Sequence, residues 1–197
     1  MKSFLLAVLI TSACLSGCLF SENKEDQYQS IDDEIDVDEF SVHCLEHDNL
    51  ERCWLLLVPA ILNESTNIPL LVDIHGGGDD MYQQRWTSDF ANLSIEQGFI
   101  VAYPQGHDNL WNQAEGVIPG ANEEDVGFII KMIDEIKNNY TIDHSRIYVT
   151  GWSIGCGMAH RLAVQASDVF AAAGCMSMYQ FANVDTCLLY TSPSPRD

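Results

Sequence analysis

Residues 146–157 read Arg-Ile-Tyr-Val-Thr-Gly-Trp-Ser-Ile-Gly-Cys-Gly, and this stretch decides the fold. Arg146 to Thr150 is rich in β-branched residues and predicts a strand, while Ile154 to Gln165 predicts a helix. The two are joined by Gly151-Trp152-Ser153-Ile154-Gly155, a G-x-S-x-G motif. Such a motif is informative only when it connects a strand to a helix, and that is its context here.

Ser153 is the candidate nucleophile of this motif. The flanking glycines allow backbone to approach backbone in a sharp turn, which carries strained geometry at the serine. The turn would present Ser153 at the carboxyl end of the sheet, with the dipole of the following helix behind it. We therefore predict a nucleophilic serine rather than an ordinary turn serine.

Short apolar runs alternate with helical patterns along the rest of the chain. Strands are expected at Trp54–Val58, Pro69–Ile74, Phe99–Tyr103 and Phe170–Met176, and helices at Trp86–Gln97 and Val126–Asn138. Gly98 is placed to end the first helix, and Asp125 to cap the second. Strands alternating with helices across short loops predict an α/β fold, with a mostly parallel sheet covered by helices on both faces.

A second motif, His75-Gly76-Gly77-Gly78, stands where one of these strands ends. Acyl transfer builds negative charge on a carbonyl oxygen, and amides fixed in advance stabilise that charge. The amide of Ile154 would supply one donor, and the amide of Gly77 or Gly78 the other. His75 is expected to hold this loop by hydrogen bonding rather than to act as a general base.

Residues 68–178 resemble the polyhydroxybutyrate depolymerase and feruloyl esterase family of secreted α/β-hydrolases. The resemblance is carried, in order, by Pro69–Gly78, Gly98–Gly106, Trp111-Asn112, Asp125–Ile129, Tyr140–Gly151, the serine motif and Asp168–Ala172. It implies a three-layer α/β-hydrolase sandwich. It also implies hydrolysis of a polyester, a feruloylated polysaccharide or a smaller acyl ester through an acyl-enzyme on Ser153, with no metal ion and no organic cofactor.

The family's catalytic acid and histidine follow the serine, in the α/β-hydrolase order Ser, Asp, His. We expect both to lie beyond this sequence, so that the hydrolase domain of residues 41–186 is cut after the strand that follows the serine helix. Asp168 is expected in a solvent-facing turn, and Asp185 lacks a strand-end position. His160 lies about two helical turns from Ser153, roughly 10 Å along the axis.

The first residues predict a lipoprotein signal peptide. Lys2 precedes the apolar run Phe4–Ile10, which is too short to span a bilayer. Leu15-Ser-Gly-Cys18 resembles a lipobox, so residues 1–17 would be removed and Cys18 lipidated; an ordinary signal peptide is the alternative. Residues 18–40 are acidic and poor in large apolar side chains, which predicts a disordered tether. The expected location is the extracytoplasmic face of a prokaryotic membrane, contacted through Cys18.

The last residues, 187–197, read Cys-Leu-Leu-Tyr-Thr-Ser-Pro-Ser-Pro-Arg-Asp. This string matches eleven consecutive codons of a transposase-type sequencing adapter. A natural Pro/Ser-rich tail is the alternative. We expect an artefact and leave the segment out of the fold prediction.

Four of the seven cysteines lie between residues 41 and 186. Cys44 and Cys53 flank a turn-like stretch between two strand-like runs and are expected to form a disulfide across a hairpin. Cys156 and Cys175 could pair or could be small buried apolar residues. No Cys/His spacing predicts a zinc site.

The formal net charge of −20 disfavours a nucleic-acid partner, because neutralising phosphates requires clustered Lys and Arg. The sequence thus predicts a secreted, lipid-anchored serine esterase. A lipid-anchored polymer- or carbohydrate-binding module that keeps the fold without catalysis is the alternative, and a related hydrolase of peptides or thioesters is another. Fold alone does not choose among substrates.

Overall fold

The computed structural model describes residues 40–62, 67–114 and 116–178. Contacts divide the chain into residues 1–36 and 37–197, so every described residue belongs to the second unit. The expected signal peptide, Cys18, Asp185 and the segment 187–197 lie outside the described residues. Within the described part, no helix combines the length and the hydropathy of a membrane span.

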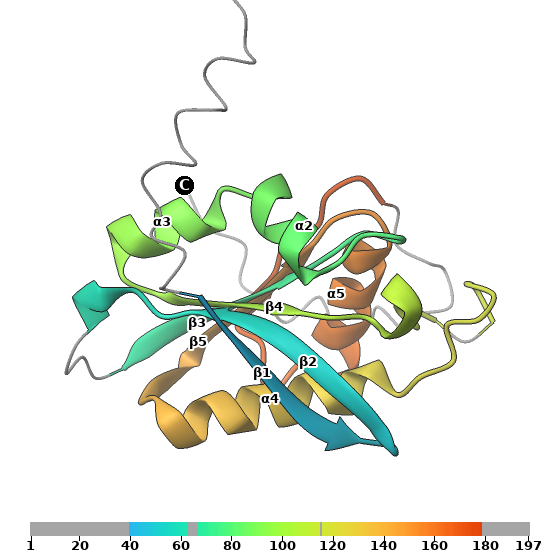
Figure 1. Cartoon of the computed structure of the whole chain (residues 1–197), viewed down its shortest axis with the longest axis horizontal. Helices are drawn as coiled ribbons and strands as arrows, with labels where there is room; N and C mark the ends of the chain where they lie inside the picture. Colours follow the sequence, from blue (N-terminus) through green and yellow to red (C-terminus); the bar gives the residue numbers. More distant parts are fainter. Residues whose placement is uncertain (1–39, 63–66, 115, 179–197) are drawn as a thin grey trace, which may run out of the picture. The chain divides into compact units, whose positions relative to one another are not determined.

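One six-stranded sheet organises the described residues, with strand order β1-β2-β4-β3-β5-β6 (Figure 1). Neighbouring strands are antiparallel from β1 to β4 and parallel from β4 to β6. The prediction of a mostly parallel sheet is therefore confirmed. The strands are β1 (Phe40–His47), β2 (Leu50–Leu57), β3 (Ile68–Ile74), β4 (Ile100–Pro104), β5 (Ile142–Gly151) and β6 (Ala172–Ala173).

Helices cover both faces of this sheet. One face carries α2 (Met81–Thr87) and α3 (Phe90–Gln97), and the other carries α4 (Asp125–Asn139) and α5 (Ile154–Gln165). Two short 3-10 turns, η2 (Ala60–Leu62) and η3 (His107–Asn109), lie in the connections. The three layers, helix on sheet on helix, match the predicted sandwich.

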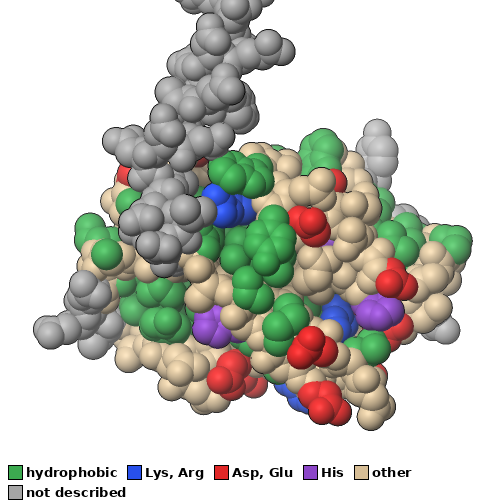
Figure 2. All heavy atoms as spheres, viewed as in Figure 1, with side chains coloured by type: hydrophobic (Ala, Val, Ile, Leu, Met, Phe, Trp, Pro, Cys, Tyr) green, Lys and Arg blue, Asp and Glu red, His purple; other side chains and the backbone are tan. Residues whose placement is uncertain are grey.

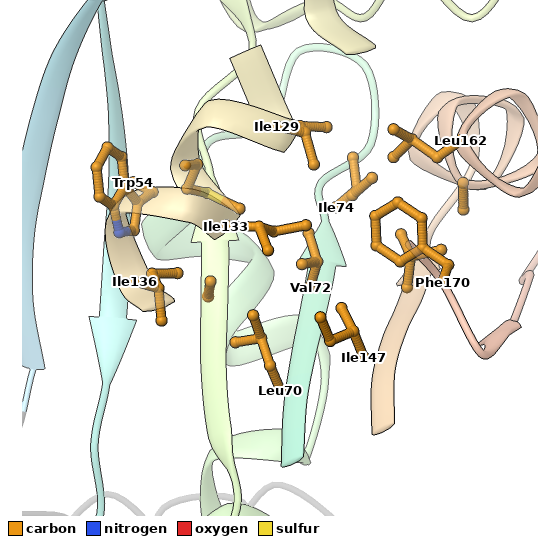
Figure 3. Close-up of a cluster of buried hydrophobic side chains, with 14 of the residues drawn as sticks. Trp54, Leu70, Val72, Ile74, Ile129, Ile133, Ile136, Ile147, Leu162 and Phe170 are labelled. Atoms are coloured by element: carbon orange, nitrogen blue, oxygen red, sulfur yellow. The ribbon is translucent and has the colours of Figure 1, made fainter. Parts of the chain in front are cut away.

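The larger core lies between the sheet and the α4–α5 layer. Figure 3 shows Ile129, Ile133 and Ile136 of α4 directed at side chains of the central strands, among them Val72. These α4 positions and Met132 are buried and form one apolar face of the helix. A smaller cluster on the other face joins Met81 of α2 to Leu55, Val101 and Tyr103.

The single helix predicted over Trp86–Gln97 is wrong, because the structure forms two helices. Asp80 caps α2 through a capping box with Gln83, which starts the first helix at Met81. Ser88 then leaves the helix in an extended conformation, and its hydroxyl donates to the buried Asp73 at 2.6 Å. The Asp-x-x-Gln spacing was a usable signal for the earlier start, whereas the break depends on a distant partner.

Several strand boundaries also differ from prediction, since β2 and β5 each start four residues earlier than expected, at Leu50 and Ile142. The strand expected over Phe170–Met176 is reduced to Ala172–Ala173, although Gly174 and Met176 each donate one further hydrogen bond to β5. Phe40, assigned to the tether, is the first residue of β1 and pairs with Leu57. Gly98 ends α3 as predicted, in the left-handed conformation with φ 74° and ψ 64°.

The surface of the described unit carries few cations. Figure 2 shows Lys and Arg side chains lying singly on the face viewed, among acidic and hydrophobic side chains. Several large apolar side chains are exposed, including Trp86 on α2 and Trp152 beside the candidate nucleophile.

Candidate active site

Ser153 lies at the turn between β5 and α5, in a backbone conformation that only the surrounding structure can hold. Its φ is 52° and its ψ is −121°, outside the helix that begins at the next residue. The amide of Trp152 donates to the carbonyl of Ile74 at 3.1 Å, and the amide of Ser153 donates to the carbonyl of Met176 at 2.9 Å. Hydrogen bonds to segments on both sides of β5 thus fix the turn.

The two glycines of the motif are required by close backbone packing. A Cβ atom on Gly155 would collide with the carbonyl oxygens of Ile74 and His75. A Cβ atom on Gly151 would collide with the backbone of Gly155 itself. The end of β3, the end of β5 and the start of α5 therefore meet backbone to backbone, which only glycine permits.

His75 connects the loop after β3 to the loop after β4. Its Nε2 atom accepts from the amide of Gly106 at 2.9 Å, so its Nδ1 atom carries the proton and donates to the carbonyl of Gly76 at 2.7 Å. The indole of Trp111 donates to the carbonyl of His75 at 3.1 Å. Burial lowers the pKa of His75, which keeps the ring neutral. The expectation that His75 holds its loop by hydrogen bonding is met.

The three glycines after His75 differ in what their amides do. The amide of Gly78 donates to the carbonyl of Asn109 at 2.9 Å. No hydrogen bond among the described residues uses the amide of Gly77 or of Ile154. These two residues lie together, since a Cβ on Gly77 would lie 3.1 Å from Cδ1 of Ile154. The amides of Gly77 and Ile154 are therefore uncommitted, and their role as oxyanion donors stays a prediction.

The other polar candidates lie away from Ser153. His160 follows it by seven residues on α5, and its Nδ1 atom lies 4.0 Å from Sγ of Cys175. Asp168 is exposed in the turn after α5, as expected. No described histidine or aspartate is hydrogen-bonded to Ser153.

Asp125 is not the cap of α4, contrary to the prediction. The cap is Glu124, whose carboxylate accepts from the amide of Gly127 at 2.7 Å. Asp125 is the first helical residue and pairs with Arg52 of β2 at 2.6 Å, and both side chains are buried. Its second oxygen accepts from the amide of Asn112 at 2.8 Å. A buried arginine needs a buried anion, and this need decides the role of Asp125.

Asp73 is a buried carboxyl group that no local sequence pattern marks. It lies two residues before His75, fully buried, and accepts from Gln84 at 2.8 Å and from Ser88 at 2.6 Å. Burial raises its pKa to about 6. Gln84 lies in α2 and Ser88 directly follows it. Asp73 therefore holds α2 against β3, on the face of the sheet opposite to α5.

Both cysteine pairs of the described residues form disulfides. Cys44 and Cys53 lie opposite each other on β1 and β2, and Cys156 of α5 is bonded to Cys175 after β6. Glu51 lies near the first pair and His160 near the second, with potential ligand atoms within 4.8 Å of one another. Sulfur in a disulfide is not the thiolate that binds a metal ion. In this oxidised form neither group offers a complete metal site.

The sequence also matches a known protein family. The model of the esterase PHB depolymerase family matches residues 53–189. Feruloyl esterase B of Piromyces equi is 35% identical over 106 residues, which cover 53% of this chain and 20% of that protein. Poly(3-hydroxyalkanoate) depolymerase C of Paucimonas lemoignei is 34% identical over 114 residues, which cover 54% of this chain and 27% of that protein. The chain spans less than a third of the length of these relatives.

A solved structure described as a thermostable esterase shares the architecture. It superposes with a TM-score of 0.57 at 26% identity, over 70% of this chain and 40% of that chain. The chain has the α/β-hydrolase fold.

Proposed function

The chain belongs to the esterase PHB depolymerase family, and we propose that the protein is a serine hydrolase of carboxylic esters with Ser153 as nucleophile. The observation that carries the proposal is the positive φ of Ser153 in a turn fixed by its neighbours. A non-glycine residue is uncommon in this region, and such strain persists mainly at functional sites. The names of the two relatives also point to hydrolysis of an ester bond, since one is a feruloyl esterase and the other a poly(3-hydroxyalkanoate) depolymerase.

In the proposed reaction, Oγ of Ser153 attacks the ester carbonyl and its proton passes to a general base. The amides of Gly77 and Ile154 hold the negative charge that develops on the carbonyl oxygen. Gly78 is the weaker candidate, because its amide already donates to Asn109. The alcohol then leaves with a proton, and water hydrolyses the acyl-enzyme to release the acid and restore Ser153.

The general base of this proposal lies outside the described residues. Both ring nitrogens of His75 are engaged in hydrogen bonds, so its lone pair is not free to accept the serine proton. His160 lies about two helical turns away, beyond hydrogen-bond reach. An Asp and a His later in the complete protein, in the α/β-hydrolase order, would complete the triad.

We extend the proposal to substrate and location. The substrate is a polyester, a feruloylated polysaccharide or a smaller acyl ester, in keeping with the names of the relatives. Lipidation at Cys18 would hold the enzyme at the extracytoplasmic face of the membrane, with the acidic segment as the tether. No metal ion or organic cofactor takes part in this scheme.

The test uses the complete protein encoded by the gene, Ser153→Ala and the control Ser167→Ala, whose serine is exposed in the turn after α5. Hydrolysis of 4-nitrophenyl acetate and methyl ferulate should fall by about 10³-fold or more in Ser153→Ala and stay near wild type in Ser167→Ala. A fluorophosphonate probe should add its mass to the peptide that contains Ser153. If Ser153→Ala hydrolyses esters like the wild type, or if the wild type hydrolyses none and binds polymer, the esterase proposal fails.

A further inference from the structure

We propose that the disulfide between Cys156 and Cys175, together with His160, is a thiol–disulfide exchange site that controls how firmly the Ser153 turn is held. The exchange chemistry follows from the geometry of the described residues. Its effect on ester hydrolysis rests on the function proposed above.

The disulfide closes a covalent link around the turn. Cys156 is the third residue of α5, fully buried, and its amide donates to the carbonyl of Ser153 at 2.9 Å. Cys175 precedes Met176, whose carbonyl accepts from the amide of Ser153. Cys156 thus contacts Ser153 from the helix side, and Met176 contacts it from the sheet side. The disulfide joins Cys156 to Cys175, the neighbour of Met176.

Opening this bond would leave the sheet side weakly attached. The segment of residues 174–176 is hydrogen-bonded to β5 through the amide of Gly174 at 2.8 Å and the amide of Met176 at 3.0 Å. It follows β6, the outermost strand of the described sheet and only two residues long. Segments at a sheet edge with few buried contacts open most readily. The acceptor of the Ser153 amide would then become mobile, and so would the turn.

The surroundings of the disulfide favour exchange with a thiol. Cys175 is exposed, so its sulfur can be attacked from solvent. His160 places Nδ1 4.0 Å from that sulfur, where a neutral imidazole can take the proton of an incoming thiol. Burial lowers the pKa of His160 and keeps the ring neutral. The displaced Cys156 thiolate is buried in the first turn of α5, where the helix dipole offsets part of the cost of burying its negative charge.

The exchange balances with a dithiol reductant. One thiolate of the reductant attacks Sγ of Cys175, the bond to Cys156 breaks, and its electron pair leaves on the Cys156 thiolate. The second thiol of the reductant then attacks the mixed disulfide, so that the reductant is oxidised to its cyclic disulfide and Cys175 is released as a thiol. Two electrons and two protons pass from the reductant to the cysteine pair.

The Cys44–Cys53 disulfide is an internal control. It also contains an exposed residue, Cys44, but it joins two paired strands and lies beside the carboxylate of Glu51. A carboxylate repels an approaching thiolate and does not stabilise a departing one. The two disulfides of the same molecule should therefore differ in exchange rate.

The first measurement follows the two disulfides in the complete protein during limited reduction with dithiothreitol, with alkylation and mass spectrometry of each cysteine. We expect Cys156–Cys175 to open at least about tenfold faster than Cys44–Cys53. His160→Asn should slow the opening of Cys156–Cys175 by about tenfold, whereas the control His144→Asn should not change it. Equal rates, faster opening of Cys44–Cys53, or no effect of His160→Asn would overturn the exchange site.

The second measurement compares amide hydrogen exchange with only Cys156–Cys175 open and with both disulfides closed. Exchange at Ser153 should rise on opening and return on reoxidation, while exchange in the β1–β2 hairpin stays constant. Ester hydrolysis should fall and recover in parallel. Unchanged exchange at Ser153 would overturn control of the turn. A different result is faster amide hydrogen exchange at Ser153 with no ester hydrolysis, whether the disulfide is open or closed. That result would refute the proposed function and leave this inference standing.

Discussion

The imidazole of His75 accepts a hydrogen bond from the amide of Gly106, 31 residues further along the chain, at 2.9 Å. The same ring donates to the carbonyl of Gly76, so one neutral side chain fixes the glycine loop on one side and the end of β4 on the other. The position of Gly77 beside Ile154 therefore depends on a histidine that does not need to exchange protons.

Replacing His75 by Ala should damage both stability and catalysis. The buried amide of Gly106 loses its acceptor, which should lower the free energy of unfolding by about 1–3 kcal/mol. Loss of the loop position should lower kcat/KM by about tenfold or more. The pH profile of the residual activity should keep its wild-type limbs, because His75 is not the base. Denaturant titration and a kcat/KM profile test this, and a lost limb in the variant would contradict it.

Replacing Gly155 by Ala should prevent the turn from forming as observed. Its Cβ would collide with two carbonyl oxygens, which can retreat only if β3 and α5 separate. We expect a loss of about 3 kcal/mol or more in unfolding free energy. Gly174→Ala is the matched control, since its Cβ would approach only the side chain of Thr150, at 3.1 Å. Equal stability of the two variants would contradict this close backbone packing at Gly155.

Asp73 should make stability depend on pH. Burial raises its pKa from 3.8 to about 6, so the unfolded chain releases this proton at lower pH than the folded protein does. Its favourable contribution is complete below about pH 4 and is lost as pH rises through about 6, for a total of about 3 kcal/mol. The unfolding free energy of the wild type relative to Asp73→Asn should fall across this window. A constant difference between pH 4 and pH 7 would show that the carboxyl titrates normally.

Removing Arg52 should leave Asp125 as an uncompensated buried charge. Arg52→Leu should lower the free energy of unfolding by about 3–5 kcal/mol. The double variant Arg52→Leu/Asp125→Leu should lose less than the sum of the two single variants. Lys137→Leu is the control, because its partner Asp134 is exposed and that pair should contribute about 1 kcal/mol or less. Additive losses at Arg52 and Asp125 would mean that the two charges do not interact.

The parts of the fold that sequence predicted best are those with local causes. The bounds of α5 agree with the prediction, since the turn at Ser153 fixes where it starts and its apolar pattern runs to Gln165. The loop role of His75 followed from its place at a strand end. The oxyanion role of Gly77 and Ile154 remains a prediction, supported by their adjacency.

The features that sequence did not predict depend on partners distant in the chain. Arg52 and Asp125 are 73 residues apart, and neither position carries a local pattern that marks a buried ion pair. The break between α2 and α3 depends on the hydrogen bond from Ser88 to Asp73, and helical periodicity alone runs through it. Local propensity is overridden in both places by the need to satisfy a buried charge.

The strand order has a consequence for synthesis on the ribosome. β1 and β2 are joined by a two-residue turn and can pair as soon as both have emerged, but β3 lies between β4 and β5. Both edges of β3 are covered only after β5 has been synthesised to Gly151. Parallel pairing between strands so far apart in the sequence is slow. A nascent chain paused before Gly151 would present an apolar strand edge to other chains, so the rate of translation through β5 should govern how much protein escapes aggregation.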